Sequence, residues 1–235
     1  MSAFIIGSTG LCGNFILKHA PEYYNTVYSL SRSEPRAFNS NSLPSGVNIL
    51  AEKDAFNNWE SKINESLLKN ETNLENLESF FSGLATTAAQ AGGAEGRHKI
   101  DYELNLKLAK VAKSKGFKKY IIISSLGANS NSKFSYLKTK GQLEDEIIKL
   151  NFDQTIILRP GVLTGERIQS KGFLENILNK SLNGIRNTRL APYLLSPVSG
   201  EEVALAALKL SKSSNNNEKV VIVSGNEINK IANES

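Results

Sequence analysis

Two residues that could transfer a proton stand four positions apart in the run Tyr136-Leu-Lys-Thr-Lys140. On a helix, positions i and i+4 lie on one face, so the phenol and the ammonium group would point the same way. A neighbouring cation stabilises a phenolate and lowers the pKa of a tyrosine from its usual value of about 10. Such a pair can donate a proton to a carbonyl being reduced or accept one from an alcohol being oxidised. By itself, however, the pattern occurs by chance in many helices.

Two serines precede this pair at the end of a short apolar run. Lys119 to Ser124 contains Tyr-Ile-Ile-Ile, which is typical of a central strand in a parallel sheet. The carboxyl end of such a strand opens onto the crevice where α/β proteins bind ligands. The hydroxyl of Ser124 or Ser125 could hydrogen-bond a substrate oxygen there, beside Tyr136. Serines are common at strand ends, so each is a weak signal alone.

A glycine-rich turn stands between an expected strand, Phe4 to Ile6, and an expected helix, Asn14 to Ala20. Its glycines are spaced three apart, and the turn comprises Gly7, Ser8, Thr9, Gly10, Leu11, Cys12 and Gly13. Glycine lets the backbone turn sharply and lets a pyrophosphate approach the N–H groups of a helix start, where the helix dipole favours negative charge. The placement predicts a dinucleotide-binding site. The alternative is an ordinary tight turn between a strand and a helix.

The residue type after the second expected strand, Thr26 to Leu30, bears on the choice of cofactor. Sites specific for NAD place an acidic residue there for the ribose 2′-hydroxyl, whereas a basic residue pairs with the 2′-phosphate of NADP. Here the residue is Arg32, whose guanidinium suits bidentate phosphate contacts. We therefore predict NADP(H), with a solvated surface arginine as the alternative. Asp54, after the third expected strand, could bind the adenine amino group or cap a helix.

Composition and charge restrict the class of protein. The chain has 235 residues, 40% hydrophobic and 22% charged, which suits one sizeable globular core. Its net charge is +5, but the basic residues are scattered, so nucleic-acid binding is not indicated. The single cysteine, Cys12, excludes an intrachain disulfide, and two distant histidines without a Cys/His cluster predict no metal site. No apolar run reaches the roughly 18 residues of a membrane span, and we expect no targeting peptide ahead of the first strand.

Strand-like runs alternate with helical segments, without repeats or long linkers. This pattern predicts an α/β fold, a doubly wound parallel sheet of the Rossmann type. The remaining strands are expected at Asn48–Ala51, Ser79–Leu84, Gln154–Leu158 and Val220–Val223, and further helices at Asp101–Lys115 and Ser135–Leu150. Glu144, Asp145 and Glu146 are expected on the solvated face of the last of these helices. We expect a poorly ordered tail over Ile228 to Ser235.

A single domain is predicted over residues 1–235. Its cofactor-binding and catalytic core is expected in residues 1–164, and a small irregular cap on the substrate side in residues 165–200. A C-terminal helix, the last strand and the tail would occupy residues 201–235.

As a set, these motifs resemble the short-chain dehydrogenase/reductase superfamily in its atypical branch. Within it, the chain is similar to the Tat-interacting-protein group of NADP-binding proteins and to its fungal relatives, the "found in mitochondrial proteome" proteins. The resemblance runs from residue 4 to about residue 170 and is carried by Gly7-Ser-Thr-Gly-Leu-Cys-Gly13, Leu84-Ala-Thr-Thr-Ala-Ala-Gln-Ala-Gly-Gly93, Ile123-Ser-Ser-Leu-Gly-Ala128, Tyr136-Leu-Lys-Thr-Lys-Gly141 and Leu158-Arg-Pro-Gly-Val-Leu163.

The resemblance implies a Rossmann-like fold that binds NADP(H) and transfers a hydride between it and a small carbonyl or alcohol. It implies Tyr136 as general acid/base and Lys140 as the residue that lowers the tyrosine pKa and contacts the ribose. Ser125, rather than Ser124, would orient the substrate. Further cofactor contacts are implied for Ser124, for Leu84, Ala85, Thr86 and Thr87, and for Pro160, Gly161 and Val162. The fungal relatives associate with the mitochondrial outer membrane without a span, which implies a peripheral location on its cytosolic face, and the superfamily often forms homodimers.

Two other functions stay open. The serines stand a residue or two closer to Tyr136 than in many catalytic members of the superfamily. The first alternative is therefore a catalytically weak, NADPH-sensing regulatory or scaffold protein at the mitochondrial surface. The second is an isomerase or lyase that uses bound NADP internally. For the asparagine that ordinary members carry on the catalytic helix, Asn105 is the candidate counterpart, and a role at the N-terminus of its own helix is the alternative.

Overall fold

The computed structural model describes residues 1–38, 42–69, 77–164, 197–213 and 218–234. Its centre is a seven-stranded sheet in the order β3-β2-β1-β4-β5-β6-β9, in which every neighbouring pair is parallel. The strands are β1 (Ser2–Ile6), β2 (Thr26–Ser31), β3 (Val47–Ala51), β4 (Leu77–Ser82), β5 (Lys119–Ile123), β6 (Gln154–Arg159) and β9 (Val220–Ser224). The predicted doubly wound α/β sheet is confirmed.

The strands are buried on both faces, so their sequences are continuous apolar runs rather than alternating ones. In β1, Ile5 enters one core and Phe4 enters the other. Phe4 stacks on Tyr28 and on Phe80, with ring centroids 5.8 and 5.4 Å apart. Phe80 stacks in turn on Tyr120, at 5.5 Å. These rings occupy paired positions on four neighbouring strands, so a slip of one residue would turn them to the other face.

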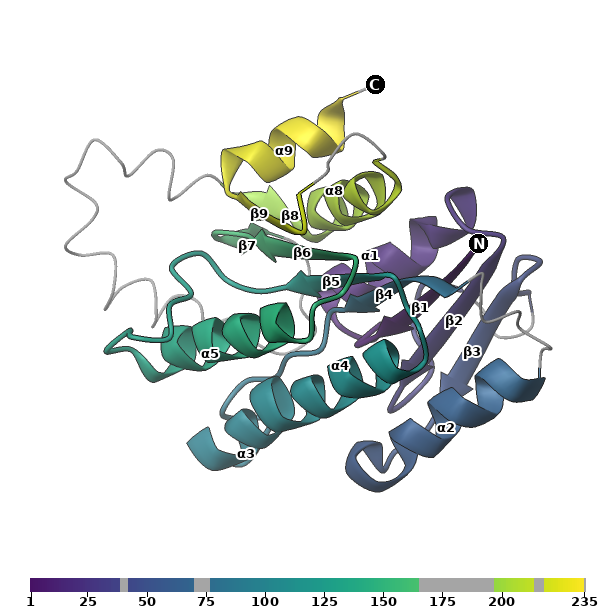
Figure 1. Cartoon of the computed structure of the whole chain (residues 1–235), viewed down its shortest axis with the longest axis horizontal. Helices are drawn as coiled ribbons and strands as arrows, with labels where there is room; N and C mark the ends of the chain where they lie inside the picture. Colours follow the sequence, from purple (N-terminus) through teal and green to yellow (C-terminus); the bar gives the residue numbers. More distant parts are fainter. Residues whose placement is uncertain (39–41, 70–76, 165–196, 214–217, 235) are drawn as a thin grey trace.

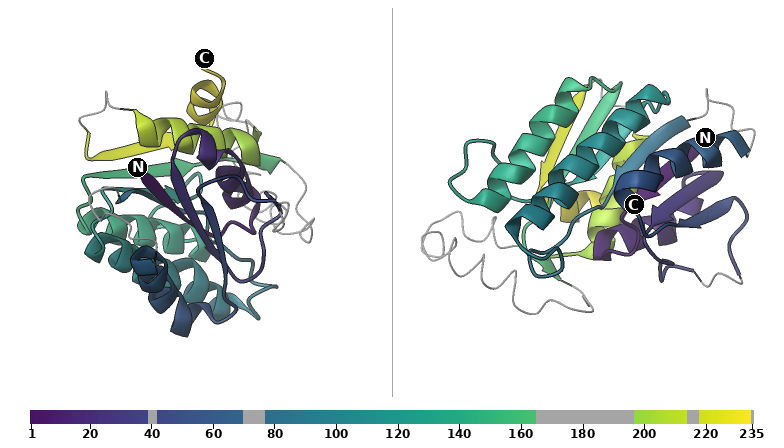
Figure 2. Two further views of the ribbon diagram at one scale, coloured as in Figure 1. Left: turned by 90° about the vertical axis from the view of Figure 1, so that its right-hand side faces the viewer. Right: turned by 90° about the horizontal axis from the view of Figure 1, so that it is seen from below.

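Helices cover both faces of the sheet (Figure 1). One face carries α1 (Leu11–His19), α8 (Gly200–Lys212) and α9 (Asn226–Asn233), and the other carries α2 (Ala55–Lys69), α4 (Asn105–Ser114) and α5 (Ser135–Lys149). The view from below in Figure 2 shows α2, α4 and α5 side by side. Two shorter elements lead into α4, namely α3 (Ala94–His98) and the π-helical segment η3 (Lys99–Leu104). The sequence predicted one continuous helix here and missed α3.

The C-terminal residues form the helix α9, so the expectation of a poorly ordered tail from Ile228 was wrong. Ile228 and Ala232 stand four residues apart, are buried, and join the core beneath α8. Lys209 of α8 also donates to the carbonyl oxygen of Ala232 at 2.9 Å. A short segment with one apolar stripe becomes helical when a neighbouring helix covers that stripe.

A second, two-stranded parallel sheet pairs β7 (Leu163–Thr164) with β8 (Val198–Ser199). It joins the end of the predicted core to the start of α8. There Ser199 accepts a hydrogen bond from the backbone N–H of Glu202, and the Glu202 carboxylate accepts one from that of Ser199. This reciprocal pair is a capping box. Residues 165–196, which make up most of the predicted cap, lie outside the described residues.

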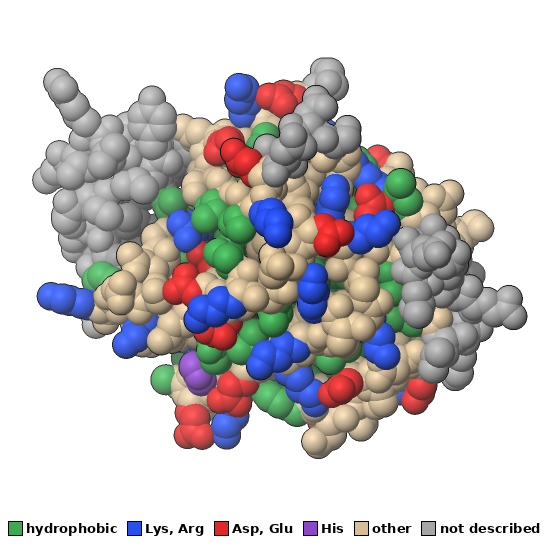
Figure 3. Space-filling model, viewed as in Figure 1, with side chains coloured by type: hydrophobic (Ala, Val, Ile, Leu, Met, Phe, Trp, Pro, Cys, Tyr) green, Lys and Arg blue, Asp and Glu red, His purple; other side chains and the backbone are tan. Residues whose placement is uncertain are grey.

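The surface shown in Figure 3 carries Lys and Arg side chains interspersed with Asp and Glu. Large apolar side chains that are exposed come from separate parts of the chain: Met1, Leu43, Phe56, Phe134 and Ile222. Within the described ranges, no helix combines the length and the apolar character needed to cross a bilayer.

Candidate functional site

The predicted site residues follow the carboxyl ends of several strands. Because all seven strands are parallel, these ends lie along one edge of the sheet. The chain reverses its direction of winding between β1 and β4, and ligands of such sheets bind in the crevice outside the strand ends at that point. The sheet therefore gathers the glycine turn, the segment after β4 and the serines after β5 at one edge.

The glycine turn is closed by a hydrogen bond from the N–H of Gly10 to the carbonyl oxygen of Gly7, at 3.0 Å. Gly7 has a φ of +79°, and a Cβ there would lie 2.5 Å from the carbonyl carbon of Gly83, at the end of β4. A Cβ on Gly13 would lie 2.3 Å from the carbonyl oxygen of Gly7. Two of the three glycines are thus required by close backbone approach. Gly10 is exposed, so its backbone is open to a ligand.

The other residues of the turn pack inward to different degrees. Ser8 is buried and shares a 2.7 Å hydrogen bond with the hydroxyl of Ser29 in β2. Cys12 is buried, and Thr9 and Leu11 are half-buried. Beside the exposed Gly10, the turn therefore presents its backbone and the partly exposed side chains of Thr9 and Leu11.

The segment after β4 is held by a buried polar network. Asn105 accepts a hydrogen bond from the hydroxyl of Ser82 at 2.6 Å and donates one to the carbonyl oxygen of Leu84 at 3.1 Å. The N–H of Thr86 donates to a carboxylate oxygen of Asp101 at 2.8 Å. Thr86 is buried, Leu84 and Thr87 are half-buried, and Ala85 is exposed. Asn105 thus fixes the backbone of this segment.

The loop that leaves β5 carries both serines and packs on α5. Ser124 is buried, and its Oγ has no hydrogen-bond partner among the described residues. The hydroxyl of the half-buried Ser125 makes only a long contact, 3.4 Å, with the next carbonyl oxygen. Further along, the N–H of Asn129 donates to the carbonyl oxygen of Leu137 in α5 at 3.1 Å. Buried polar groups are normally paired, so the Ser124 hydroxyl is available to a ligand at this edge.

Tyr136 and Lys140 lie in the first and second turns of α5, as the spacing predicted. Tyr136 is half-buried, whereas Lys140 is only 2% exposed. The guanidinium of Arg97 lies 5.4 Å from the centroid of the Tyr136 ring and donates to the hydroxyl of Ser135 at 3.1 Å. The Tyr136 ring therefore has the guanidinium of Arg97 from α3 over its face, and the buried Lys140 stands one turn further along α5.

Two other predicted contacts lie farther out. Arg32 follows β2 and is exposed, and the hydroxyl of Ser31 donates to the carbonyl oxygen of Ser33 at 2.7 Å. Asp54 precedes α2, where its carboxylate accepts from the backbone N–H of Asn57 at 3.2 Å. Hydrogen bonds from Asn57 hold the pKa of Asp54 below its usual value. Asp54 is thus a helix cap, and its contact with adenine stays a prediction.

The segment after β6 is tied to its neighbours through the backbone. The carbonyl oxygen of Pro160 accepts from the N–H of Leu126, and that of Val162 accepts from the N–H of Val198, both at 2.9 Å. Gly161 and Val162 are half-buried at the same edge of the sheet.

Comparisons with known proteins agree with this architecture. A family model described as HIM1 matches residues 37–190. The chain belongs to the HIM1 family. It is 41% identical over 238 aligned positions to "Protein FMP52, mitochondrial" of Kluyveromyces lactis, covering 100% of both chains. It is 37% identical over 233 positions to the protein of that name from Saccharomyces cerevisiae, covering 97% of this chain and 95% of the relative.

Solved structures similar to this HIM1-family chain show the fold. One is a UDP-glucuronic acid 4-epimerase from Bacillus cereus in complex with UDP-glucuronic acid and NAD. It has a TM-score of 0.67 and 15% identity and covers 100% of this chain and 84% of its own. Pal from Bacillus thuringiensis has a TM-score of 0.70 and 14% identity, covering 99% and 81%. The HIM1-family chain therefore has a Rossmann fold.

Sequence reasoning missed three buried charges in this HIM1-family chain. Asp101 and Arg97, from η3 and α3, are 1% and 8% exposed. Glu144 was predicted on the solvated face of α5, which is wrong, because it is 2% exposed and forms an ion pair with Arg159 of β6. The Nε of Arg159 donates to the Glu144 carboxylate at 3.1 Å. A charge on a helix is buried when another element supplies its partner, and this partner lies fifteen residues away.

Proposed function

We propose that this HIM1-family chain binds NADP(H) and transfers a hydride between it and a small carbonyl or alcohol. The observation that carries the proposal is the arrangement at α5. Tyr136 and the buried Lys140 share one face of that helix. The loop from β5 that packs on it carries Ser125 and Ser124, whose hydroxyl has no partner in the described part of the chain. A proton donor, a cation and two hydroxyls at the ligand edge of a Rossmann sheet are the groups that carbonyl reduction requires.

The residues present fit a dinucleotide. The turn around Gly10 exposes backbone at the start of α1, where the helix dipole favours a pyrophosphate. Arg32 follows β2 at the position that selects between a ribose 2′-hydroxyl and a 2′-phosphate, and it is exposed. A guanidinium there favours NADP(H), whereas the solved epimerases from Bacillus cereus and Thermus thermophilus are complexes with NAD.

Each residue then has a role in the proposed reaction. The cofactor supplies or accepts the hydride when bound. Tyr136 donates a proton to the substrate oxygen during reduction and takes one back during oxidation. Lys140 stabilises the phenolate that remains and contacts the ribose. Ser125 holds the substrate oxygen beside the phenol, and Ser124 turns its hydroxyl to the cofactor. Backbone groups of Leu84 to Thr87 and of Pro160 to Val162 line the nicotinamide side.

Calorimetric titration with NADPH and with NADH tests the cofactor. We expect preference for NADPH, lost in Arg32→Ala and kept in Arg36→Ala, which removes another exposed arginine from the same segment. Failure to bind either nucleotide would overturn the proposal.

A carbonyl-substrate screen with NADPH tests the chemistry. Tyr136→Phe should lower turnover by about 10²–10⁴-fold with little change in NADPH affinity. Tyr23→Phe, which alters a tyrosine before β2 at the opposite edge of the sheet, should keep full turnover. Equal rates for Tyr136→Phe and the unchanged chain would refute the mechanism.

The short spacing from Ser125 to Tyr136, eleven residues, favours a second candidate, an NADPH-sensing regulatory or scaffold protein with weak catalysis. The relatives are named as mitochondrial proteins, and the resemblance adds peripheral association with the outer membrane and a homodimer as proposals. This candidate predicts NADPH-dependent capture of a partner that survives Tyr136→Phe and fails in Gly10→Asp. Capture indifferent to NADPH and to Gly10→Asp would refute it.

A further inference from the structure

A buried carboxylate lies between two parts of the candidate site. Asp101 stands in η3 and is 1% exposed. Its Oδ1 accepts from the N–H of Thr86 at 2.8 Å, which fixes the segment after β4. Its Oδ2 is buried and has no hydrogen-bond partner among the described residues. An ionised carboxylate with a free, buried oxygen is costly unless a cation compensates its charge.

The cations that face Asp101 come from the elements packed around η3. Lys140 lies on α5, which packs against η3, and is 2% exposed. Arg97 and His98 lie on α3, directly before η3. Burial raises the pKa of Asp101, and the charge of Lys140 is the strongest influence in the opposite direction, ahead of the Thr86 hydrogen bond, Arg97 and His98. Lys140 is thus one of the cations whose charge reaches Asp101, and it lies on the same helix face as Tyr136.

The π-helical turn explains how a charged residue enters this position. A wide turn shifts the residues that follow relative to an ideal helix, and such turns are frequent at functional sites. The side-chain nitrogen of Asn105 donates to the carbonyl oxygens of Ile100 and Asp101, at 3.4 and 3.3 Å, within that turn. The turn is therefore held by its own polar contacts, with Asp101 directed inward.

We propose that Asp101 is a positioning residue for the candidate site: its carboxylate is a counter-charge for the buried ammonium of Lys140, while its Oδ1 fixes Thr86. The inference rests on the proposed function for what Lys140 does. Asp101 adds a counter-charge from outside α5 to the pair formed by Tyr136 and Lys140. Without the Asp101 carboxylate, the positive charge of Lys140 would stand uncompensated in a buried site.

The first test needs neither substrate nor cofactor. The carboxyl group of Asp101 is titrated by carbon NMR in the full chain, in Lys140→Met and in the control Lys138→Met, which removes an exposed lysine from the same helix. Loss of the Lys140 charge should raise the pKa of Asp101 further in Lys140→Met. Lys138→Met should leave it unchanged. An equal pKa in all three proteins would overturn the inference.

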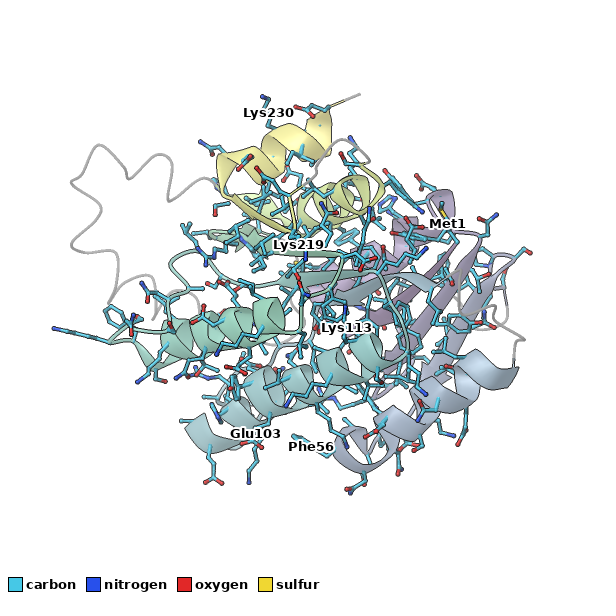
Figure 4. The ribbon with its side chains drawn as sticks, in the orientation of Figure 1. Met1, Phe56, Glu103, Lys113, Lys219 and Lys230 are labelled. Atoms are coloured by element: carbon cyan, nitrogen blue, oxygen red, sulfur yellow. The ribbon has the colours of Figure 1, made fainter. Side chains whose placement is uncertain are left out.

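The second test separates positioning from a merely structural role. Asp101→Asn keeps an oxygen for the N–H of Thr86 but removes the charge, and Glu103→Gln removes a charge that is half-exposed on the outer side of the same segment (Figure 4). If turnover occurs, the alkaline limb of the pH profile of kcat/KM should move to lower pH in Asp101→Asn, because the site loses a buried negative charge. Glu103→Gln should keep the original limb. An unmoved limb in Asp101→Asn would overturn the inference and leave the proposed function standing.

The two proposals fail in different ways. If the unchanged chain shows no turnover with any carbonyl, the proposed function fails, and the titration of Asp101 alone decides whether Lys140 is its counter-charge. If Asp101→Asn does not fold, Lys140→Met still gives the result.

Discussion

Replacing Gly141 by alanine tests how the candidate site is assembled. Gly141 lies inside α5, directly after Lys140. A Cβ at this position would lie 2.3 Å from the carbonyl carbon of Asn129 and 2.3 Å from the amide nitrogen of Ser130. Ordinary contacts between such atoms are about 3.5 Å or longer, so the loop from β5 or the helix must withdraw by about 1 Å.

Gly141→Ala should destabilise the protein, although helix propensity alone would make the same substitution stabilising. Alanine in place of glycine inside a helix normally stabilises by about 1 kcal/mol. Here the added methyl group meets backbone atoms, which cannot rotate away as a side chain can. The cost should lie at the upper end of the range for overpacking, about 3 kcal/mol. Combining the two gives a net loss of about 2 kcal/mol in the free energy of unfolding.

Urea unfolding of Gly141→Ala against the unchanged chain measures this loss. The variants Lys138→Ala and Lys138→Gly change an exposed position of the same helix. The difference between their free energies of unfolding measures the helix propensity of alanine relative to glycine in α5, and we expect about 1 kcal/mol in favour of alanine. If Gly141→Ala proved as stable as the unchanged chain or more stable, the close packing of the loop on α5 would be refuted. In that case this packing would not bring the serines to the face of Tyr136.

Three further predictions concern the frame of the site. A Cβ would lie 2.3 Å from a backbone oxygen at Gly13 but 3.2 Å at Gly10, so Gly13→Ala should lower the melting temperature far more than Gly10→Ala. Glu144→Ala should cost about 2 kcal/mol in chemical denaturation, because it leaves the partly buried Arg159 without its partner. A backbone N–H at the start of α8 holds the pKa of Glu202 below its usual value. The stability that Glu202 contributes is therefore lost as pH falls through its folded-state pKa, and melts between about pH 5 and pH 3 should show a weaker pH dependence in Glu202→Gln.

The strands could be read from the sequence because their signal is local. Runs such as Tyr120 to Ile123 are apolar and β-branched over the length of one strand, and turn residues bound them. Each strand of the sheet lies within two residues of its predicted bounds. The pairing of Tyr136 with Lys140 was equally accessible, since it needs only the 3.6-residue period of a helix.

The buried charges could not be read in this way, because their partners come from other elements. Glu144 belongs to an acidic run that looks solvated until β6 brings Arg159 to it. Asp101 enters the interior through a π-helical turn, which shifts the helical phase that a sequence pattern assumes. For α9 the signal was present, since Ile228 and Ala232 have helical spacing, but eight residues are too few to predict a stable helix without the neighbour that covers them.

The two faces of the sheet position the candidate site by the same device. On one face, Gly13 lets α1 lie directly against the turn that ends β1; on the other, Gly141 lets α5 lie against the loop that ends β5. In each case a backbone contact, rather than a side chain, sets the distance between a helix and a strand end. Glycine in place of alanine weakens a helix by about 1 kcal/mol. Its presence at both positions indicates that the close approach of helix and strand end stabilises the fold by more than this loss of helix propensity. A substitution at either glycine should therefore displace backbone that the site uses, even though neither residue has a side chain to contribute.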